Sequence, residues 1–114
     1  MKTTLRLVEL EKDHGFLSEW WKLHGWEPVP AAVLPKLGAI AMIEGVPVAA
    51  AWLYQDNSVG VCWLEWLVTN PKATPKQLLL AINTVIRFLR ERAVELDYGV
   101  MMTTCRHVLM RDYR

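Results

Sequence analysis

The sequence contains little cysteine and little histidine, which limits covalent crosslinks and metal sites. Its 114 residues include two cysteines, Cys62 and Cys105, and three histidines that lie far apart along the chain. Two cysteines are too few for a disulfide framework or a four-ligand zinc site, and the histidines lack the spacing of metal ligands. We therefore expect reduced thiols and no bound metal. Cys105 follows a predicted strand, where a small apolar filler is a more common role than a nucleophile.

The chain also lacks an excess of charge of either sign. Thirteen Lys and Arg against twelve Asp and Glu give a formal net charge of +1. No bulk electrostatic field then attracts nucleic acid or anionic lipid to the protein. We expect neither nucleic acid nor a membrane surface among its partners.

Long uninterrupted hydrophobic runs are absent as well. The apolar stretch 37–54 is broken by Glu44, Gly45 and Pro47, well short of the roughly 20 residues that a transmembrane helix requires. The first residues provide neither the hydrophobic region nor the small-residue cleavage site of a signal peptide. These absences favour a protein of the cytoplasm.

Apolar side chains, in contrast, are abundant. They make up 53% of the sequence and include six Trp, enough for the core of one domain over residues 1–114. Alternating polarity predicts a first strand over 3–9. Asp13 is the expected N-cap of an amphipathic helix that ends near Gly25. Flanking prolines leave room only for a short second helix over 31–36.

The middle of the chain predicts three consecutive antiparallel strands. Runs 38–43 and 46–54 are apolar and are joined by Glu44-Gly45, which indicates a hairpin turn. A third run, 59–69, is rich in Val, Trp and Leu and follows a polar turn. Short connections of this kind join neighbouring antiparallel strands.

The second half of the chain changes period from strand to helix. Thr74 as N-cap and Pro75 at the first helical position begin a long helix with one broad apolar stripe, which ends near Gly99. A strand over 100–104 and a final helix over 107–114 follow.

Together these elements predict an α/β (α+β) fold with a mixed, mostly antiparallel sheet of about five strands and helices on both faces. The chain order is strand, helix, short helix, three strands, long helix, strand, helix. Because a helix-length connection joins them, the strands 59–69 and 100–104 are expected to be parallel neighbours with a right-handed crossover.

Residues around the start of the long helix carry a resemblance to a known family. A strand that ends Leu67-Val68-Thr69-Asn70-Pro71 and leads through a short loop to a long helix resembles the acetyl-CoA motif of the GNAT superfamily of N-acetyltransferases. Near the C-terminus, Tyr113 stands at the family's tyrosine position, whereas Arg106 and Leu109 replace the family's Asn and Ala. Residues 46–54 and 63–66 look like small phage-borne members, which would work in the host cytoplasm.

The resemblance implies a way of holding acetyl-CoA. In the family, the pantetheine arm bonds to the backbone of the strand before the long helix, which here offers Leu67, Val68 and Thr69. The diphosphate of the cofactor rests at the N-terminus of that helix, where N–H groups and the helix dipole attract it. The corresponding loop of this chain runs Lys72, Ala73, Thr74, Pro75, Lys76, Gln77.

This loop departs from the family's pattern. The family places glycines here so that the backbone can approach phosphate, and this loop has none. Pro75 also removes one N–H donor. Lys72 and Lys76 would then hold the phosphates as point charges, with a strong dependence of binding on salt.

Two residues are candidates for catalysis on this resemblance. Glu65 lies mid-strand, on the face predicted for Trp63 and Leu67, and a carboxylate beside indoles in a cleft would accept the amine's proton. The alternative is a solvated position on the open face of the sheet. Tyr113 would donate a proton to the leaving thiolate of coenzyme A. Its alternative is a tyrosine at a helix end that packs on the sheet.

The function implied is an N-acetyltransferase that transfers acetyl from acetyl-CoA to an amine by direct attack, without an acyl-enzyme. The amine acceptor, a small molecule or a protein, is not identified by these residues. The alternative is a catalytically inactive GNAT-like binding module that acts through a protein partner. Typical family members continue beyond the tyrosine through two more strands, and this sequence ends at Arg114. Because an open strand edge recruits a partner strand, we expect a homodimer.

Overall fold

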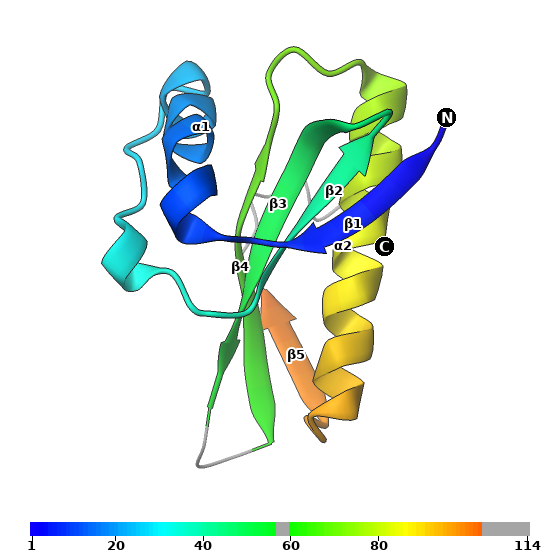
Figure 1. Cartoon of the computed structure of the whole chain (residues 1–114). Helices are drawn as coiled ribbons and strands as arrows, with labels where there is room; N and C mark the ends of the chain where they lie inside the picture. The colour runs from blue at the N-terminus through cyan, green and yellow to red at the C-terminus, as the bar shows by residue number, and fades with distance from the viewer. Residues whose placement is uncertain (57–59, 104–114) are drawn as a thin grey trace.

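In the part of the chain that the structure describes, the fold is a five-stranded mixed sheet with one helix on each face (Figure 1). The structure, a computed structural model, describes residues 1–56 and 60–103. The sheet order β1-β2-β3-β4-β5 follows the chain. The strands are β1 (Thr3–Leu7), β2 (Gly38–Ile43), β3 (Val46–Gln55), β4 (Val61–Thr69) and β5 (Val100–Thr103). The helices are α1 (Leu10–Leu23), the 3₁₀ turn η1 (Ala31–Val33) and α2 (Pro75–Glu95).

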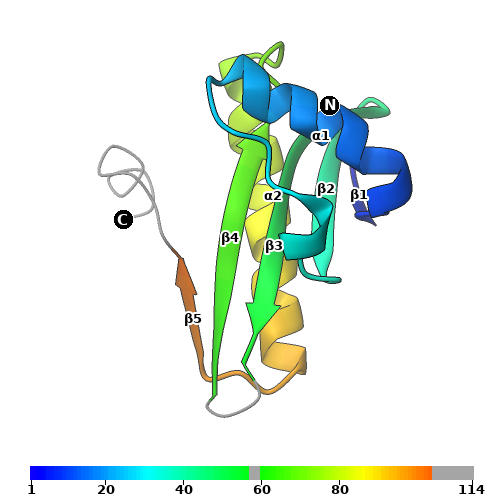
Figure 2. The ribbon, with the colours of Figure 1, turned by 90° about the vertical axis from the view of Figure 1, so that its left-hand side faces the viewer.

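The predicted fold class is confirmed by the strand pairing. β1 to β4 pair antiparallel in sequence, and β4 pairs with β5 in parallel after the crossover through α2. The β2–β3 turn is the expected one, since Glu44 and Gly45 both have positive φ values of 51° and 77°. β5 lies at the edge of the sheet (Figure 2).

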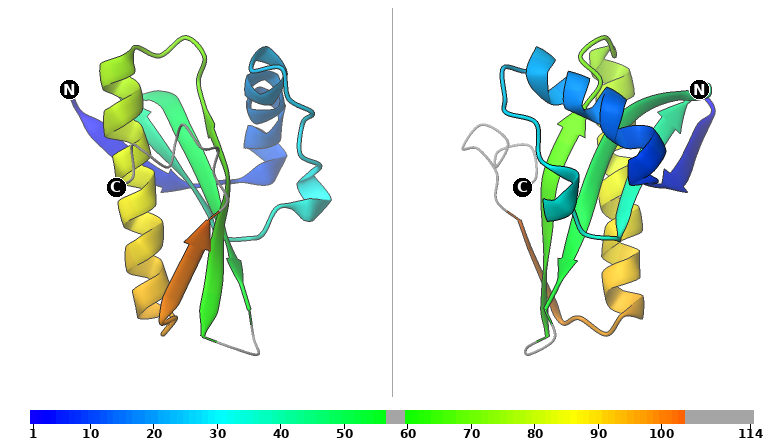
Figure 3. Two further views of the ribbon diagram at one scale, coloured as in Figure 1. Left: turned by 180° about the vertical axis from the view of Figure 1, so that it is seen from behind. Right: turned by 60° about the vertical axis from the view of Figure 1, so that its left-hand side comes forward.

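Helix α2 packs on one face of the sheet, called here the α2 face (Figure 3). Thr74 is its N-cap and Pro75 its first residue, as predicted. The helix buries one residue per turn along a single stripe: Ala81, Val85, Leu89 and Ala93. Opposite them the strands present mostly small side chains, which lets the helix approach the sheet closely: Ala39, Ala41, Ala49 and Ala51.

Helix α1 covers the other face, called here the α1 face. Its core consists of the helix residues Leu17, Trp20 and Trp21 on the strand residues Ile40, Ala50, Trp52 and Val68. The rings of Trp21 and Trp52 stack with centroids 5.9 Å apart. Trp52 is fully buried over Gly38, where a Cβ atom would overlap its indole. Glycine is therefore required at position 38 by its neighbour's volume.

The start of α1 differs from the prediction. The helix begins at Leu10 with Glu9 as N-cap residue, so Asp13 lies inside its first turns, and β1 ends at Leu7 instead of residue 9. The carboxylate of Asp13 is buried and accepts two hydrogen bonds of 2.8 Å from Arg6 and one of 2.8 Å from the N–H of Glu9. Asp13 thus caps the helix from within because Arg6 holds its carboxylate in place.

Other boundaries also shift. The short helix expected over 31–36 is reduced to η1, because Leu34 has the extended backbone typical of a residue before proline. β4 begins at Val61, later than residue 59. The last residue of the strand expected over 100–104 and the whole helix expected over 107–114 lie outside the described residues. No helix in the described part of the chain is long and apolar enough to cross a membrane.

Candidate functional site

Strand β4 contains a bulge at Trp66 that decides which way its residues face. Glu65 pairs with Trp52 and Val68 with Ala50, so β4 has one residue more than β3 between these pairs. Trp66 has a φ value of 62°, a left-handed conformation that is uncommon for a bulky residue. The bulge is fixed by a hydrogen bond of 2.7 Å from the indole N–H of Trp66 to the hydroxyl of Tyr54.

The bulge separates two residues that the sequence pattern placed together. Trp63 and Glu65 alternate onto the α1 face, where Glu65 lies opposite the buried Trp52. Leu67 instead packs against the core of the α2 face. The expectation of a common face for Glu65 and Leu67 is therefore wrong, because the extra residue in β4 reverses the alternation beyond it.

Among the described residues, β5 pairs with β4 as far as Leu64, just before the bulge. The last pair is Leu64 with Thr103, whereas β4 continues to Thr69 (Figure 2). The N–H of Asn70 donates to the carbonyl of Val48 over 2.8 Å, so Val68, two residues earlier, also directs its backbone groups to β3. Leu67 and Thr69 therefore direct theirs to the outer edge, where no described residue of β5 pairs with them.

One backbone group of this edge, the carbonyl of Thr69, accepts a hydrogen bond from a residue that the sequence analysis missed. The Nε2–H of His24 donates to the carbonyl oxygen of Thr69 over 2.9 Å, and the imidazole stacks on Trp26 with centroids 5.0 Å apart. His24 is the C-cap residue of α1, 45 positions away from Thr69 in the sequence. No local pattern could have linked two residues so far apart. The edge-facing backbone groups that bond to no described residue are thus the N–H and carbonyl of Leu67 and the N–H of Thr69.

The loop between β4 and α2 uses its own N–H groups. The N–H groups of Lys72 and Ala73 donate to the side chain and the backbone carbonyl of Asn70 over 3.0 and 3.1 Å. Thr74 and Gln77 form a reciprocal capping box, in which each side chain accepts from the other's N–H over 3.2 and 3.0 Å.

Whether these residues can hold coenzyme A depends on which of their backbone groups are already hydrogen-bonded. In the part of the chain that the structure describes, Leu67 presents at the edge of β4 the unpaired backbone donor and acceptor that a pantetheine arm needs. The loop does not fit a diphosphate as a backbone cradle, because four of its N–H groups are bonded within the chain and Pro75 has none. Among residues 72–77 only the N–H of Lys76 has no acceptor in the described part of the chain.

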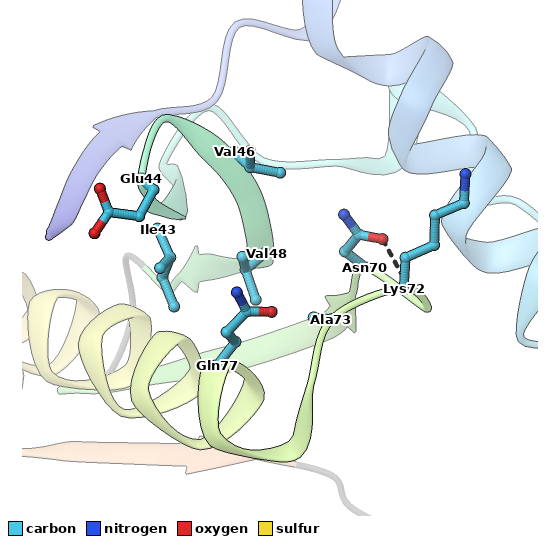
Figure 4. Close-up of a pocket in the computed structure, with 8 residues that line it drawn as sticks. All are labelled: Ile43, Glu44, Val46, Val48, Asn70, Lys72, Ala73 and Gln77. Carbon is cyan, nitrogen blue, oxygen red and sulfur yellow. Dashed lines mark hydrogen bonds between the residues drawn. The ribbon is translucent and has the colours of Figure 1, made fainter. Parts of the chain in front are cut away.

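A shallow pocket lies on another side of this loop. It has a volume of about 270 Å³ and is lined by the β2–β3 hairpin together with Asn70, Lys72, Ala73 and Gln77 (Figure 4). Glu65, Leu67 and Thr69 do not line it. The predicted site residues therefore divide into two groups, one at the edge and α1 face of β4 and one at the β4–α2 loop.

The face around Glu65 is aromatic and ordered by hydrogen bonds. The Tyr54 hydroxyl, which accepts from Trp66, donates in turn to the carbonyl of Val33 over 2.7 Å and so connects η1 to the sheet. Glu65 is half-buried. Tyr113, the other proposed catalytic residue, lies outside the described residues, so its role stays a prediction.

Cys62 lies on the α2 face below this site. Its side chain is buried, and burial raises the pKa of its thiol. A thiol of this kind stays protonated near neutral pH and is a poor nucleophile. In the described part of the chain, no group of three or more His, Cys, Asp or Glu side chains forms a metal site.

Comparisons with solved structures identify the fold. N-acetylglutamate synthase from Neisseria gonorrhoeae, solved with coenzyme A and N-acetyl-glutamate, matches with a TM-score of 0.71, 10% identity and coverage of 99% of this chain but 27% of that one. Glucosamine-6-phosphate N-acetyltransferase from Arabidopsis thaliana matches at 0.67, with 14% identity and coverage of 99% and 88%. A GNAT family acetyltransferase from Streptococcus pneumoniae matches at 0.66, with 13% identity and coverage of 99% and 84%.

These matches define the class of protein at the level of fold. The chain has the GNAT acetyltransferase fold, as its sequence resemblance implied. It spans about a quarter of the length of the synthase. No family model matches the sequence, and no curated protein matches it.

Proposed function

We propose that the protein is a GNAT-type N-acetyltransferase that transfers acetyl from acetyl-CoA to an amine by direct attack. The observation that carries this proposal is the bulge at Trp66, beyond which the backbone groups of Leu67 face the outer edge of β4, where no described residue pairs with them. Such an edge adds an extended ligand by backbone hydrogen bonds, as an extra strand would.

Each residue then has a role. Leu67 and Thr69 hold the pantetheine arm through their edge-facing groups, while Val68 anchors the strand through its buried side chain. Acetyl-CoA supplies the activated thioester when bound. Glu65 accepts the proton of the attacking amine from the α1 face, and Tyr113 donates a proton to the leaving thiolate.

Calorimetry with acetyl-CoA tests the proposal directly. A titration at micromolar protein should give saturable heat, and a thiol assay with glucosamine 6-phosphate or L-glutamate as test amine should then detect turnover. Glu65→Gln should lower turnover by about 10²-fold or more without changing affinity for acetyl-CoA, as expected for loss of a general base. Glu91→Gln, an exposed change on α2, is the matched control.

A second function is favoured by one observation. The capped N–H groups of the β4–α2 loop and Pro75 remove the backbone cradle for a diphosphate. This supports a catalytically inactive GNAT-like module that binds a protein partner. If neither acetyl-CoA nor coenzyme A binds saturably, the result favours this binding module over the enzyme.

A further inference from the structure

The hydrogen bonding of the β4–α2 loop bears on which part of an acyl donor this protein recognises, an inference that rests on the proposed function. A phosphate at a helix N-terminus is held by N–H groups that point at it. Here the side chains of Thr74 and Gln77 already accept from each other's N–H groups. A diphosphate would have to displace the accepting side chain before it gained the contact with either N–H.

The loop is also anchored from behind, which opposes its rearrangement. Asn70 receives the N–H groups of Lys72 and Ala73. Asn70 itself donates from its side chain to the carbonyl of Pro47 over 3.1 Å and from its backbone to the carbonyl of Val48 over 2.8 Å. Asn70 therefore anchors the turn to β3 and also accepts the N–H groups of Lys72 and Ala73.

The remaining attraction for a diphosphate is electrostatic and weak. Lys72 and Lys76 are exposed, so their charges are surrounded by solvent and screened by salt. Point charges on flexible stems also provide little of the geometry that fixes a diphosphate. In contrast, the edge of β4 at Leu67 presents backbone groups whose binding to an amide-containing chain does not depend on salt.

We propose that this domain recognises its acyl donor through the pantetheine arm alone, without a backbone grip on the nucleotide diphosphate. The ligand class is a pantetheine thioester. Acetyl-CoA is one member of this class, and S-acetyl-pantetheine, which lacks the nucleotide, is an equally good one.

The test compares the affinities of these two ligands by calorimetry. At about 0.5 M NaCl the two dissociation constants should agree within about threefold, because screening removes the contribution of the lysines. At about 0.05 M NaCl acetyl-CoA should gain up to about tenfold. A preference for acetyl-CoA of about 30-fold or more that persists at high salt would overturn this inference but support the proposed function. Failure of both ligands to bind would overturn both.

A variant that opens the cap provides the reciprocal test. The double change Thr74→Gly and Pro75→Gly releases the N–H of Gln77 and adds a donor at position 75. Affinity for acetyl-CoA should rise by about fivefold or more at high salt, while affinity for S-acetyl-pantetheine stays unchanged. Thr74→Ser keeps the hydroxyl and is the matched control. If the double variant folds and the ratio of its affinities for acetyl-CoA and S-acetyl-pantetheine is unchanged, the inference is contradicted. If the variant does not fold, the comparison of the two ligands on the unaltered protein remains the test.

Discussion

Replacing Asp13 by Asn should destabilise the protein in a pH-dependent way. Asp13 is 3% exposed, and its carboxylate takes part in three hydrogen bonds of 2.8 Å, two from Arg6 and one from the N–H of Glu9. The hydrogen bonds from Arg6 are the main reason why the pKa of Asp13 is lowered, against the opposing effect of burial. Charge-assisted bonds of this type contribute about 1.5–3 kcal/mol each. Because the Arg6 side chain is 37% exposed and regains water, we expect a net loss of about 2 kcal/mol.

The sign of the pH dependence follows from the lowered pKa. The unfolded chain, with an Asp pKa of about 3.9, binds a proton more readily than the folded one, so the pair stabilises the fold fully above that value. Its contribution is lost as pH falls through the lower pKa of the folded state. Urea unfolding of both proteins should therefore give a constant difference from neutral pH down to about pH 5 and a shrinking difference below about pH 4. A difference that is absent at pH 7, or that does not shrink in acid, would refute the reasoning.

Three further changes have expected outcomes. Gly38→Ala should cost about 2–3 kcal/mol in urea unfolding, because the new methyl group overlaps a buried indole; a loss below about 0.5 kcal/mol would contradict the packing described. Cys62 should resist alkylation at neutral pH in the native state and react once the protein unfolds, which peptide mapping by mass spectrometry can follow. The double change Lys72→Ala and Lys76→Ala should weaken acetyl-CoA binding by about tenfold at low salt and little at high salt. Lys36→Ala should leave the affinity for acetyl-CoA unchanged at both salt concentrations.

Features set by neighbouring residues could be predicted from the sequence. Thr74 and Pro75 begin α2 as expected, because a capping box and a proline at the first position act within one turn. The Glu44-Gly45 turn is equally local. The parallel pairing of β4 and β5 followed from the length of the connection alone.

Features that depend on distant contacts could not be predicted. Asp13 has the chemistry of an N-cap, but its partner Arg6 draws it into the interior of a helix that starts earlier. The hydrogen bond from His24 to Thr69 joins two elements with no pattern in common. The bulge is hardest to foresee, because its left-handed residue is Trp66 and not glycine, and the hydroxyl that fixes it belongs to β3.

If the proposed function is correct, the bulge also explains how the single strand β4 can contact both substrates, the amine and the thioester. Without the extra residue, Leu67 would share the α1 face with Glu65. With it, the Glu65 side chain stays on the α1 face while the Leu67 side chain turns into the α2 core. The backbone of Leu67 is left facing the edge. An amine would then approach Glu65 across the face beside Tyr54 and Trp66, and a thioester would lie along the edge. The two would meet at the bulge, so transfer would need no movement of the sheet.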